Sequence, residues 1–445
     1  MKRLYLDHNA TSPLRPEVRQ EIADFLAGNC GNPSSIHTTG RNVRRKVDTA
    51  REQVAQLIGA KPSEIVFTSG GVEANHLAWH AFEKAGKKIA TTVIEHSCIR
   101  GASEMSEQCQ AQVHRICIKK DGSICPSEIE KLIAFDPDFV SMHHANNETG
   151  AMYDVKAISH ALKPECYVHT DAVQTVGKIP VNVNDLGVDY LTISAHKLGA
   201  LQGMGALYVR KGSPFEPFWT GGSQERGRRS GTENVIGILS FGKACEVIAA
   251  KIEHIGSQYS ALRDRFEKGL SQNLDGIYIT ASTQPRIGNT SHIIFEGIDA
   301  ESLLIAADLE GLDFSTGSAC HSGAIDPSHV VLAMGFDPEV AKGAIRFSLG
   351  WSTTEEDIDC RCDFVSFGQH HSRKKACIVI TNIRFTHSTS ALLMCLVIQL
   401  FQYLRSCLKR LYNQAHLTPV VHKHRHLQRP KSVSKMQEIL TNSAF

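Results

Sequence analysis

Short apolar runs alternate with amphipathic segments through the first half of the chain, and this alternation limits the possible folds most strongly. Strands that alternate with helices are typical of a mostly parallel sheet covered by helices on both faces. The sequence therefore predicts an α/β fold. The expected strands are 64–67, 89–93, 113–118, 139–143, 166–169, 189–194 and 204–209, with helices that include 16–28, 41–58, 97–108 and 127–134.

The pattern changes in the second half of the chain. One long helical region is predicted from 233 to about 272, and a shorter set of elements follows it. These elements are strands near 277–280 and 292–295 and a helix at 300–309. We expect the long helical region to lead into a second, smaller domain.

Polar side chains follow two of the expected strands, at the point where each strand ends. Strand 166–169 leads to Asp171 and Gln174, and strand 189–194 leads to Ser194, His196 and Lys197. Ligands of open α/β sheets collect at the carboxyl ends of strands. A lysine beside an acid is what pyridoxal phosphate (PLP) requires, for covalent attachment and for its ring nitrogen. From these two residues alone, a surface salt bridge is the default interpretation, because aspartate and lysine are common residues.

Composition and cysteine usage indicate a cytoplasmic protein. The chain has 445 residues, 42% of them apolar and 21% charged, as in ordinary soluble domains. Its 13 cysteines lack the paired spacing of a disulfide framework. The first residues carry no secretory core, and no apolar run reaches the roughly 18–20 residues that span a bilayer. We expect neither a membrane nor a nucleic-acid partner.

The C-terminal part of the chain differs in charge from the rest. Residues 361–445 contain 13 Lys or Arg and 2 Asp or Glu, whereas the whole chain has 48 and 46. An apolar run at 391–401 interrupts this basic segment. We expect residues 360–445 to form an atypical basic tail that is poorly ordered.

Ten short motifs occur in a fixed order between residues 4 and 359. Together they resemble the PLP-dependent cysteine desulfurases, which are related to class-V aminotransferases and close to selenocysteine lyases. The resemblance covers about four-fifths of the chain, and the long loop around Cys320 is similar to the iron–sulfur-assembly branch. The motifs are at 5–11, 31–35, 65–71, 95–96, 146–150, 171 with 174, 194–197, 229–232, 317–320 and 345–350.

The resemblance implies the fold and the domain organisation. The expected fold is that of fold-type-I PLP enzymes, with a mostly parallel seven-stranded sheet in the large domain and a smaller α/β domain. The large PLP-binding domain is expected at 15–255. Residues 1–14 and 256–359 are expected to form the small domain with the cysteine loop, and the protein is expected to be a homodimer.

The resemblance also implies roles for individual residues. Lys197 would hold PLP covalently and move protons, with His96 stacked on the ring as a further catalytic residue. Asp171 would protonate the ring nitrogen, and Arg346 and Asn32 would bind the substrate. The other cofactor-binding residues would be Gly71, Val72, Asn147, Gln174, Ser194, His196 and, from the neighbouring subunit, Thr232.

Cys320 would be the sulfur-accepting nucleophile. The implied reaction converts L-cysteine to L-alanine, leaves a persulfide on Cys320 and passes the sulfur to an acceptor or scaffold protein for iron–sulfur or thio-cofactor assembly. The same cysteine could transiently ligate an iron–sulfur cluster. Two alternatives remain open: a selenocysteine lyase, or a PLP-fold protein inactivated by its altered C-terminus.

Three segments depart from the family pattern. Val72 stands where the family has a threonine whose hydroxyl binds the phosphate, so one hydrogen bond is expected to be missing. Residues 199–203, Gly-Ala-Leu-Gln-Gly, replace the usual Gly-Pro-Lys-Gly turn after the lysine. The match to the closing helix stops near residue 359, where the basic tail begins.

Overall fold

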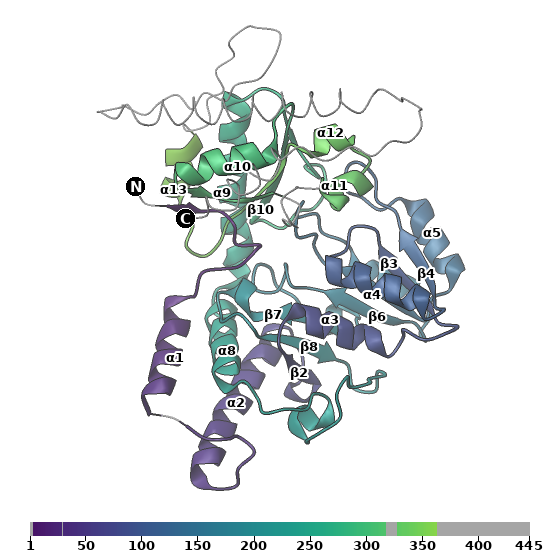
Figure 1. Ribbon diagram of the computed structural model, residues 1–445, viewed down its shortest axis with the longest axis vertical. Coiled ribbons are helices and arrows are strands. Elements are labelled where there is room, and N and C mark those ends of the chain that lie inside the picture. Colours follow the sequence, from purple (N-terminus) through teal and green to yellow (C-terminus); the bar gives the residue numbers. More distant parts are fainter. Residues whose placement is uncertain (1–2, 29, 317–326, 363–445) are drawn as a thin grey trace, which may run out of the picture. The chain divides into compact units, whose positions relative to one another are not determined.

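The computed structural model describes residues 3–28, 30–316 and 327–362 (Figure 1). Cys320 therefore lies outside the described residues. So does the predicted tail, apart from 360–362 at the end of helix α13 (Glu355–Cys362). No helix in the described ranges is long and apolar enough to cross a membrane.

The main sheet has seven strands, in the order β2-β8-β7-β6-β5-β3-β4. Strand β8 is antiparallel to both β2 and β7, and the other neighbouring pairs are parallel. The prediction of an α/β fold with a mostly parallel sheet is thus confirmed. The bounds are β2 Ile65–Thr68, β3 Lys88–Thr92, β4 Gln112–Ile116, β5 Phe139–His143, β6 Tyr167–Asp171, β7 Tyr190–Ser194 and β8 Gly205–Val209.

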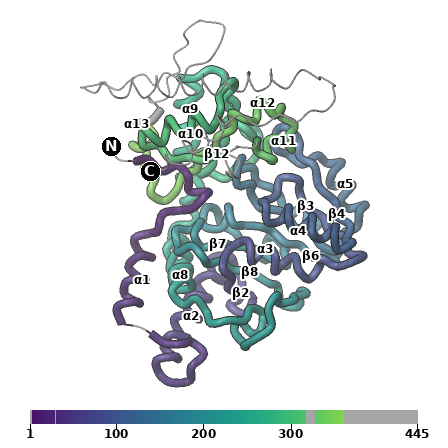
Figure 2. The backbone as a smooth tube through the Cα atoms, viewed as in Figure 1, coloured from purple at the N-terminus to yellow at the C-terminus, as the bar shows by residue number. Residues whose placement is uncertain are grey.

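Helices accompany the strands of this sheet, as the ribbon and the tube both show (Figures 1 and 2). Helix α3 begins directly after β2, and α4 begins shortly after β3, so each starts at the carboxyl end of a strand. The bounds are α1 Pro16–Gly28, α2 Thr38–Leu57, α3 Gly71–His80, α4 Ser97–Gln108, α5 Pro126–Phe135, α6 Val155–Ala161 and α7 Val183–Leu186.

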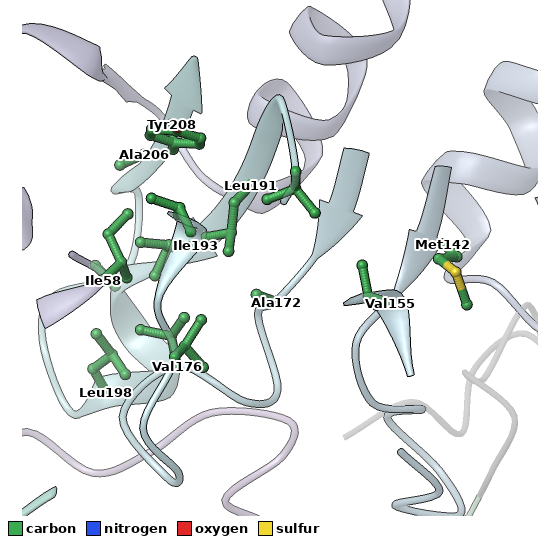
Figure 3. Packing of buried hydrophobic residues seen from close by; sticks show 14 of the residues in the cluster. Ile58, Met142, Val155, Ala172, Val176, Leu191, Ile193, Leu198, Ala206 and Tyr208 are labelled. Carbon is green, nitrogen blue, oxygen red and sulfur yellow. The ribbon is translucent and has the colours of Figure 1, made fainter. Parts of the chain in front are cut away.

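Apolar side chains pack on both faces of the sheet. Strand β7 contributes Leu191 and Ile193 to a large cluster on one face, part of which is shown in Figure 3. Its Tyr190 belongs to a second cluster with Trp79 and Phe139. Successive residues of a strand point to opposite faces, so a strand covered on both sides is apolar at nearly every position. This burial fixes the strand ends that carry the polar residues described below.

The predicted helical region 233–272 is two helices, α8 (Val235–Ala249) and α9 (Ile252–Asn273). The helical character predicted for this region is confirmed, and the structure adds a break at Lys251, which leaves the helical conformation (φ −131°, ψ 0°). The buried apolar side chains of helix α8 belong to the large cluster around the main sheet. Helix α9 begins in that cluster but buries Phe266 and Leu270 in a separate core. Because of this break, α8 packs in the core of the main sheet, whereas most of α9 packs in the separate core.

This separate core is built around a smaller antiparallel sheet with the order β12-β13-β10-β9. Leu4 and Leu6, from the start of the chain, are buried in it. We propose that residues 1–14 and 256–359 form a second domain beside 15–255. The bounds are β1 Leu4–Tyr5, β9 Ile277–Ile279, β10 Thr290–Phe295, α10 Ala300–Leu309, β11 Leu312–Asp313, β12 Ser315–Thr316, α11 His329–Ala333, α12 Pro338–Ala341 and β13 Ala344–Ser348.

Candidate functional site

A cavity of about 360 Å³ lies where strands β5, β6 and β7 end and helix α3 begins. The segment before α1 and strand β13 complete its walls, so it contains residues from far apart in the sequence. The residues that line it are Asn9, Ala10, Gly71, Val72, Asn75, His96, Cys98, His143, Ala145, Asn147, Asp171, Val173, Gln174, Ser194, His196, Lys197 and Arg346.

Lys197 lies on a single 3-10 turn, Ala195–Leu198, that follows β7 directly. Its Nζ donates hydrogen bonds to the backbone carbonyls of Asn9 and Ala10, the latter at 2.6 Å. Burial, together with the positive charge of Arg346, lowers the pKa of Lys197 to about 8. A buried lysine of this kind has a neutral amine available near neutral pH, as a nucleophile or base requires.

Asp171 is the last residue of β6, and both of its carboxylate oxygens are held in place. Asn75 Nδ2 donates to Oδ2 at 2.7 Å, and the backbone N–H of Val173 donates to Oδ1 at 3.0 Å. Gln174 follows on the next turn, where its Oε1 accepts a hydrogen bond from Lys178. The acid and the lysine of the sequence prediction therefore line one cavity.

The N-terminus of α3 forms an anion-attracting part of the wall. Gly70 precedes the helix and provides no capping side chain, so the first-turn N–H groups are not capped from the N-cap position. Ser194 and His196 lie close by on the same cavity. Burial and the charge of Lys197 lower the pKa of His196 to about 4, so its ring is neutral. Val72 lines the cavity and offers no hydroxyl.

Arg346 reaches the cavity from β13. Its Nη2 pairs with Asp7 Oδ1 at 2.9 Å, and Nη1 donates to the backbone carbonyl of Asn147 at 3.1 Å. His96 is exposed, and it accepts the backbone N–H of Cys98 at the start of α4. A guanidinium on one wall and an exposed imidazole on another leave room for a ligand between them.

Three predicted site residues are not found in this cavity. The loop residue Asn32 is exposed, and its side chain accepts the backbone N–H of Ser34 at 2.9 Å. Thr232 lines a separate cavity of about 290 Å³, beside Ser69 and Arg229. Cys320 falls outside the described residues. The roles predicted for all three stay predictions.

The structure adds residues that the sequence did not single out. Asn75 follows Gly71 by four positions, which places both on one side of α3 at its first turn. His143 ends strand β5, as Asp171 ends β6, so the rule that selected Asp171 could have found it. Cys98 has no comparable local signal.

Several buried polar atoms on the cavity wall have no partner among the described residues. They are Asn75 Oδ1, His143 Nε2 and Arg346 Nε. A buried polar atom without a hydrogen bond costs about 1–3 kcal/mol, so their grouping around one cavity indicates a polar ligand. Lys197, Asp171 and the α3 N-terminus supply an amine, an acid and an anion site. This donor set fits PLP.

Comparison with known proteins agrees with this geometry. The sequence matches the aminotransferase class-V family over residues 4–360. The chain belongs to this family. It is 42% identical over 369 residues to the cysteine desulfurase IscS of Dictyoglomus turgidum, which covers 82% of this chain and 94% of the relative. It is also 42% identical to a cysteine desulfurase of Trichormus azollae, over 81% of this chain and 91% of the relative.

The fold of this chain is also similar to the folds of solved structures. A NifS-like protein from Rickettsia africae superposes with a TM-score of 0.74 at 33% identity, covering 81% of this chain and 98% of that one. SspA, solved in complex with cysteine, gives a TM-score of 0.68 at 30% identity over 78% and 98% of the two chains. The resemblance read from the ten motifs is confirmed.

Proposed function

We propose that the protein is a PLP-dependent cysteine desulfurase that converts L-cysteine to L-alanine and transfers the sulfur to Cys320. The observation that carries the proposal is the cavity that Lys197 shares with Asp171 and Arg346. Relatives named cysteine desulfurases match about four-fifths of the chain, which supports the same reaction.

PLP, when bound, would supply an electron sink for charge that develops at the substrate Cα. Lys197 would attach it, because its amine is buried and its pKa is lowered to about 8. The same amine, once released, would carry a proton at the substrate. Asp171 would keep a proton on the ring nitrogen, and Asn75 holds its carboxylate for that contact. Gly71, Ser194 and His196 would bind the phosphate.

Arg346 would bind the substrate carboxylate. A planar guanidinium can donate two parallel hydrogen bonds to a carboxylate, and its Nε has no partner among the residues the structure describes. The Nη2 atom of Arg346 already donates a hydrogen bond to the Asp7 carboxylate. The substrate would therefore use the free Nε or compete with Asp7 for the arginine.

The sulfur step needs a thiolate as nucleophile. The thiolate of Cys320 would attack the substrate sulfur, forming an S–S bond while the C–S bond of the substrate breaks. The electron pair of the C–S bond goes to the substrate carbon, which then takes up a proton to give L-alanine. Cys320 is left as a persulfide, and an acceptor protein would remove its outer sulfur for iron–sulfur or thio-cofactor assembly.

We further propose a homodimer that works in the cytoplasm. Thr232 lines its own cavity in this chain, away from Lys197. The family resemblance implies that Thr232 contacts the phosphate from a second subunit, and its absence from the Lys197 cavity of its own chain supports that proposal. Sedimentation of the full chain measures the oligomeric state directly.

The function is tested by separating cofactor binding from sulfur transfer. Cys320→Ser should still bind PLP and L-cysteine, because the proposed pocket is formed by other residues, but it should form no persulfide. Alanine and sulfide are measured with L-cysteine, and alanine and selenide with L-selenocysteine. The matched control is Cys109→Ser, which removes an exposed thiol that does not line the cavity.

Undiminished sulfide release by Cys320→Ser would refute Cys320 as the sulfur acceptor. Turnover of selenocysteine without turnover of cysteine would replace the proposal with a selenocysteine lyase. Wild-type protein that binds no PLP would refute both enzymes.

A further inference from the structure

A buried lysine behind the cavity wall has no role in the reaction outlined above. Lys178 follows Gln174 by four positions, after a turn at Gly177, whose φ of 80° lies in the left-handed region that favours glycine. Its Nζ donates hydrogen bonds to Gln174 Oε1 at 2.9 Å and to Asn9 Oδ1 at 2.8 Å. Both of these acceptor residues line the cavity, whereas Lys178 does not.

General stability is a poor explanation for a lysine at this position. Within the described ranges no carboxylate pairs with Lys178, and its two hydrogen-bond acceptors are neutral amide oxygens. Burial, together with the positive charges of Lys197 and Arg346, lowers the pKa of Lys178. Burying an amine among other positive charges is unfavourable, and an apolar side chain would avoid this cost. What the lysine adds is two hydrogen-bond donors, placed between two amide oxygens.

Backbone carbonyls determine which end of each amide faces Lys178. A carbonyl oxygen only accepts hydrogen bonds, so the amide atom that faces it must be the nitrogen. Asn9 Nδ2 donates to the carbonyl of Asn147 at 3.2 Å, and Gln174 Nε2 donates to the carbonyl of Asn9 at 3.3 Å. The amide oxygens of Asn9 and Gln174 therefore both face Lys178.

This orientation leaves the Gln174 amide with one N–H for a ligand. Its Nε2 carries two protons, and the Asn9 carbonyl accepts one of them. The other has no acceptor in the part of the chain that the structure describes. The same Asn9 carbonyl also accepts a hydrogen bond from Lys197 Nζ. The amide donor and the lysine that would hold PLP are thus fixed to one backbone group.

We propose that Lys178 is a positioning residue that holds the Gln174 amide with an N–H toward the phenolic oxygen of PLP. This inference rests on the proposed function, and the family resemblance assigns Gln174 to that oxygen. Lys178 would act through Gln174 without touching the ligand. Without Lys178, the Gln174 oxygen would be buried without a donor, and the amide could rotate and place its own oxygen against the phenolic oxygen.

The test compares two ligands at equilibrium on the full-length apoprotein. One is PLP, and the other is its 3-deoxy analogue, which lacks the phenolic oxygen. The ratio of their dissociation constants measures the preference of the protein for that oxygen. We expect Lys178→Met to lower the preference for PLP about 5-fold, as the weakening of one hydrogen bond would, and to leave the affinity for the analogue within about 2-fold.

Two further variants separate the proposed role from packing. The matched control is Asn289→Leu, because Asn289 Nδ2 donates to the same oxygen of Asn9 at 3.0 Å but does not line the cavity. This control should leave the preference for PLP unchanged. In a Gln174→Leu background the preference is already lost, so adding Lys178→Met should lower it by less than about 2-fold.

A second experiment does not require Lys178→Met to fold. Gln174→Glu keeps Lys178 and gives its buried amine a carboxylate partner. A carboxylate has no N–H to donate, so Gln174→Glu should lose the preference for PLP as completely as Gln174→Leu does.

Equal losses of affinity for both ligands in Lys178→Met would reduce Lys178 to a packing role and overturn the proposal. So would a wild-type preference for PLP in Gln174→Glu, or an equal loss of preference in Asn289→Leu and Lys178→Met. All three results leave the desulfurase function intact, because wild type still binds PLP. Failure of wild type to bind PLP at all would instead overturn the proposed function and this inference together.

Discussion

The lowered pKa of Lys197 makes a quantitative prediction about the reactivity of its amine. With a pKa of about 8, roughly one amine in ten is neutral at pH 7. An ordinary lysine with a pKa of about 10.4 has roughly one neutral amine in 2,500. Lys197 in the apoprotein should therefore react with an amine reagent about 200-fold faster at pH 7 than the same lysine with an ordinary pKa.

Burial is the larger cause of this shift, and the charge of Arg346 is the second. Arg346→Gln removes that charge and also frees Asp7, whose negative charge raises the pKa of Lys197. Both effects favour the protonated amine. We expect the reactivity of Lys197 at pH 7 to fall about two- to fivefold and the midpoint of its pH profile to move upward.

The assay is competitive labelling of apoprotein with trace acetic anhydride between pH 6 and 11, with Lys197 quantified by peptide mass spectrometry. The rate should rise tenfold per pH unit up to about pH 8 and then level off. The control variant is Arg210→Gln, because Arg210 pairs with Asp189 outside the cavity. This assay needs no cofactor, so it tests the electrostatics of the cavity separately from the reaction.

The same pKa has a consequence for stability. The folded protein holds the pKa of Lys197 below its unfolded value, so the folded state binds fewer protons between about pH 8 and 10.5. The contribution of Lys197 to stability is then most favourable above pH 10.5 and is lost as the pH falls toward 8.

Two results of the labelling assay would refute the reasoning about the pKa of Lys197. One is a labelling midpoint near 10.4, and the other is the same pH profile in Arg346→Gln as in wild type.

Two further predictions concern the cofactor acid and a buried ion pair. Asp171→Asn should keep PLP but form alanine at least about 100-fold more slowly, because an amide cannot hold a proton on the ring nitrogen; near-normal turnover would make Asp171 structural only. Arg51 and Glu225 form a buried bidentate pair at 2.7 and 2.6 Å. Arg51→Met should lower stability by about 3–5 kcal/mol, because it leaves the buried carboxylate of Glu225 without its ion-pair partner. The loss is measured as a lower Tm. The double variant with Glu225→Met should recover most of it, and no recovery would contradict the explanation.

The sequence by itself determined the class of fold and the core of the site. Alternating strand and helix patterns predict the main sheet because burial on both faces makes each strand a continuous apolar run. Asp171 and Lys197 follow such runs directly, and strand ends meet at one edge of the sheet. Local patterns were sufficient here because the information lies within a few residues of each element.

Tertiary structure alone decided which distant residues complete the site. Nothing in the sequence pairs Glu95 with His143, 48 positions apart, or brings Asn75 to Asp171, 96 positions apart. The break between α8 and α9 is equally hidden, since Ala249, Ala250 and Lys251 all favour helix. These features arise from contacts between elements whose packing partners are chosen by the whole fold. Such contacts join residues that are far apart in the sequence and produce no periodic pattern in it. They can therefore be recognised only in the folded structure, where the strands and helices are placed together.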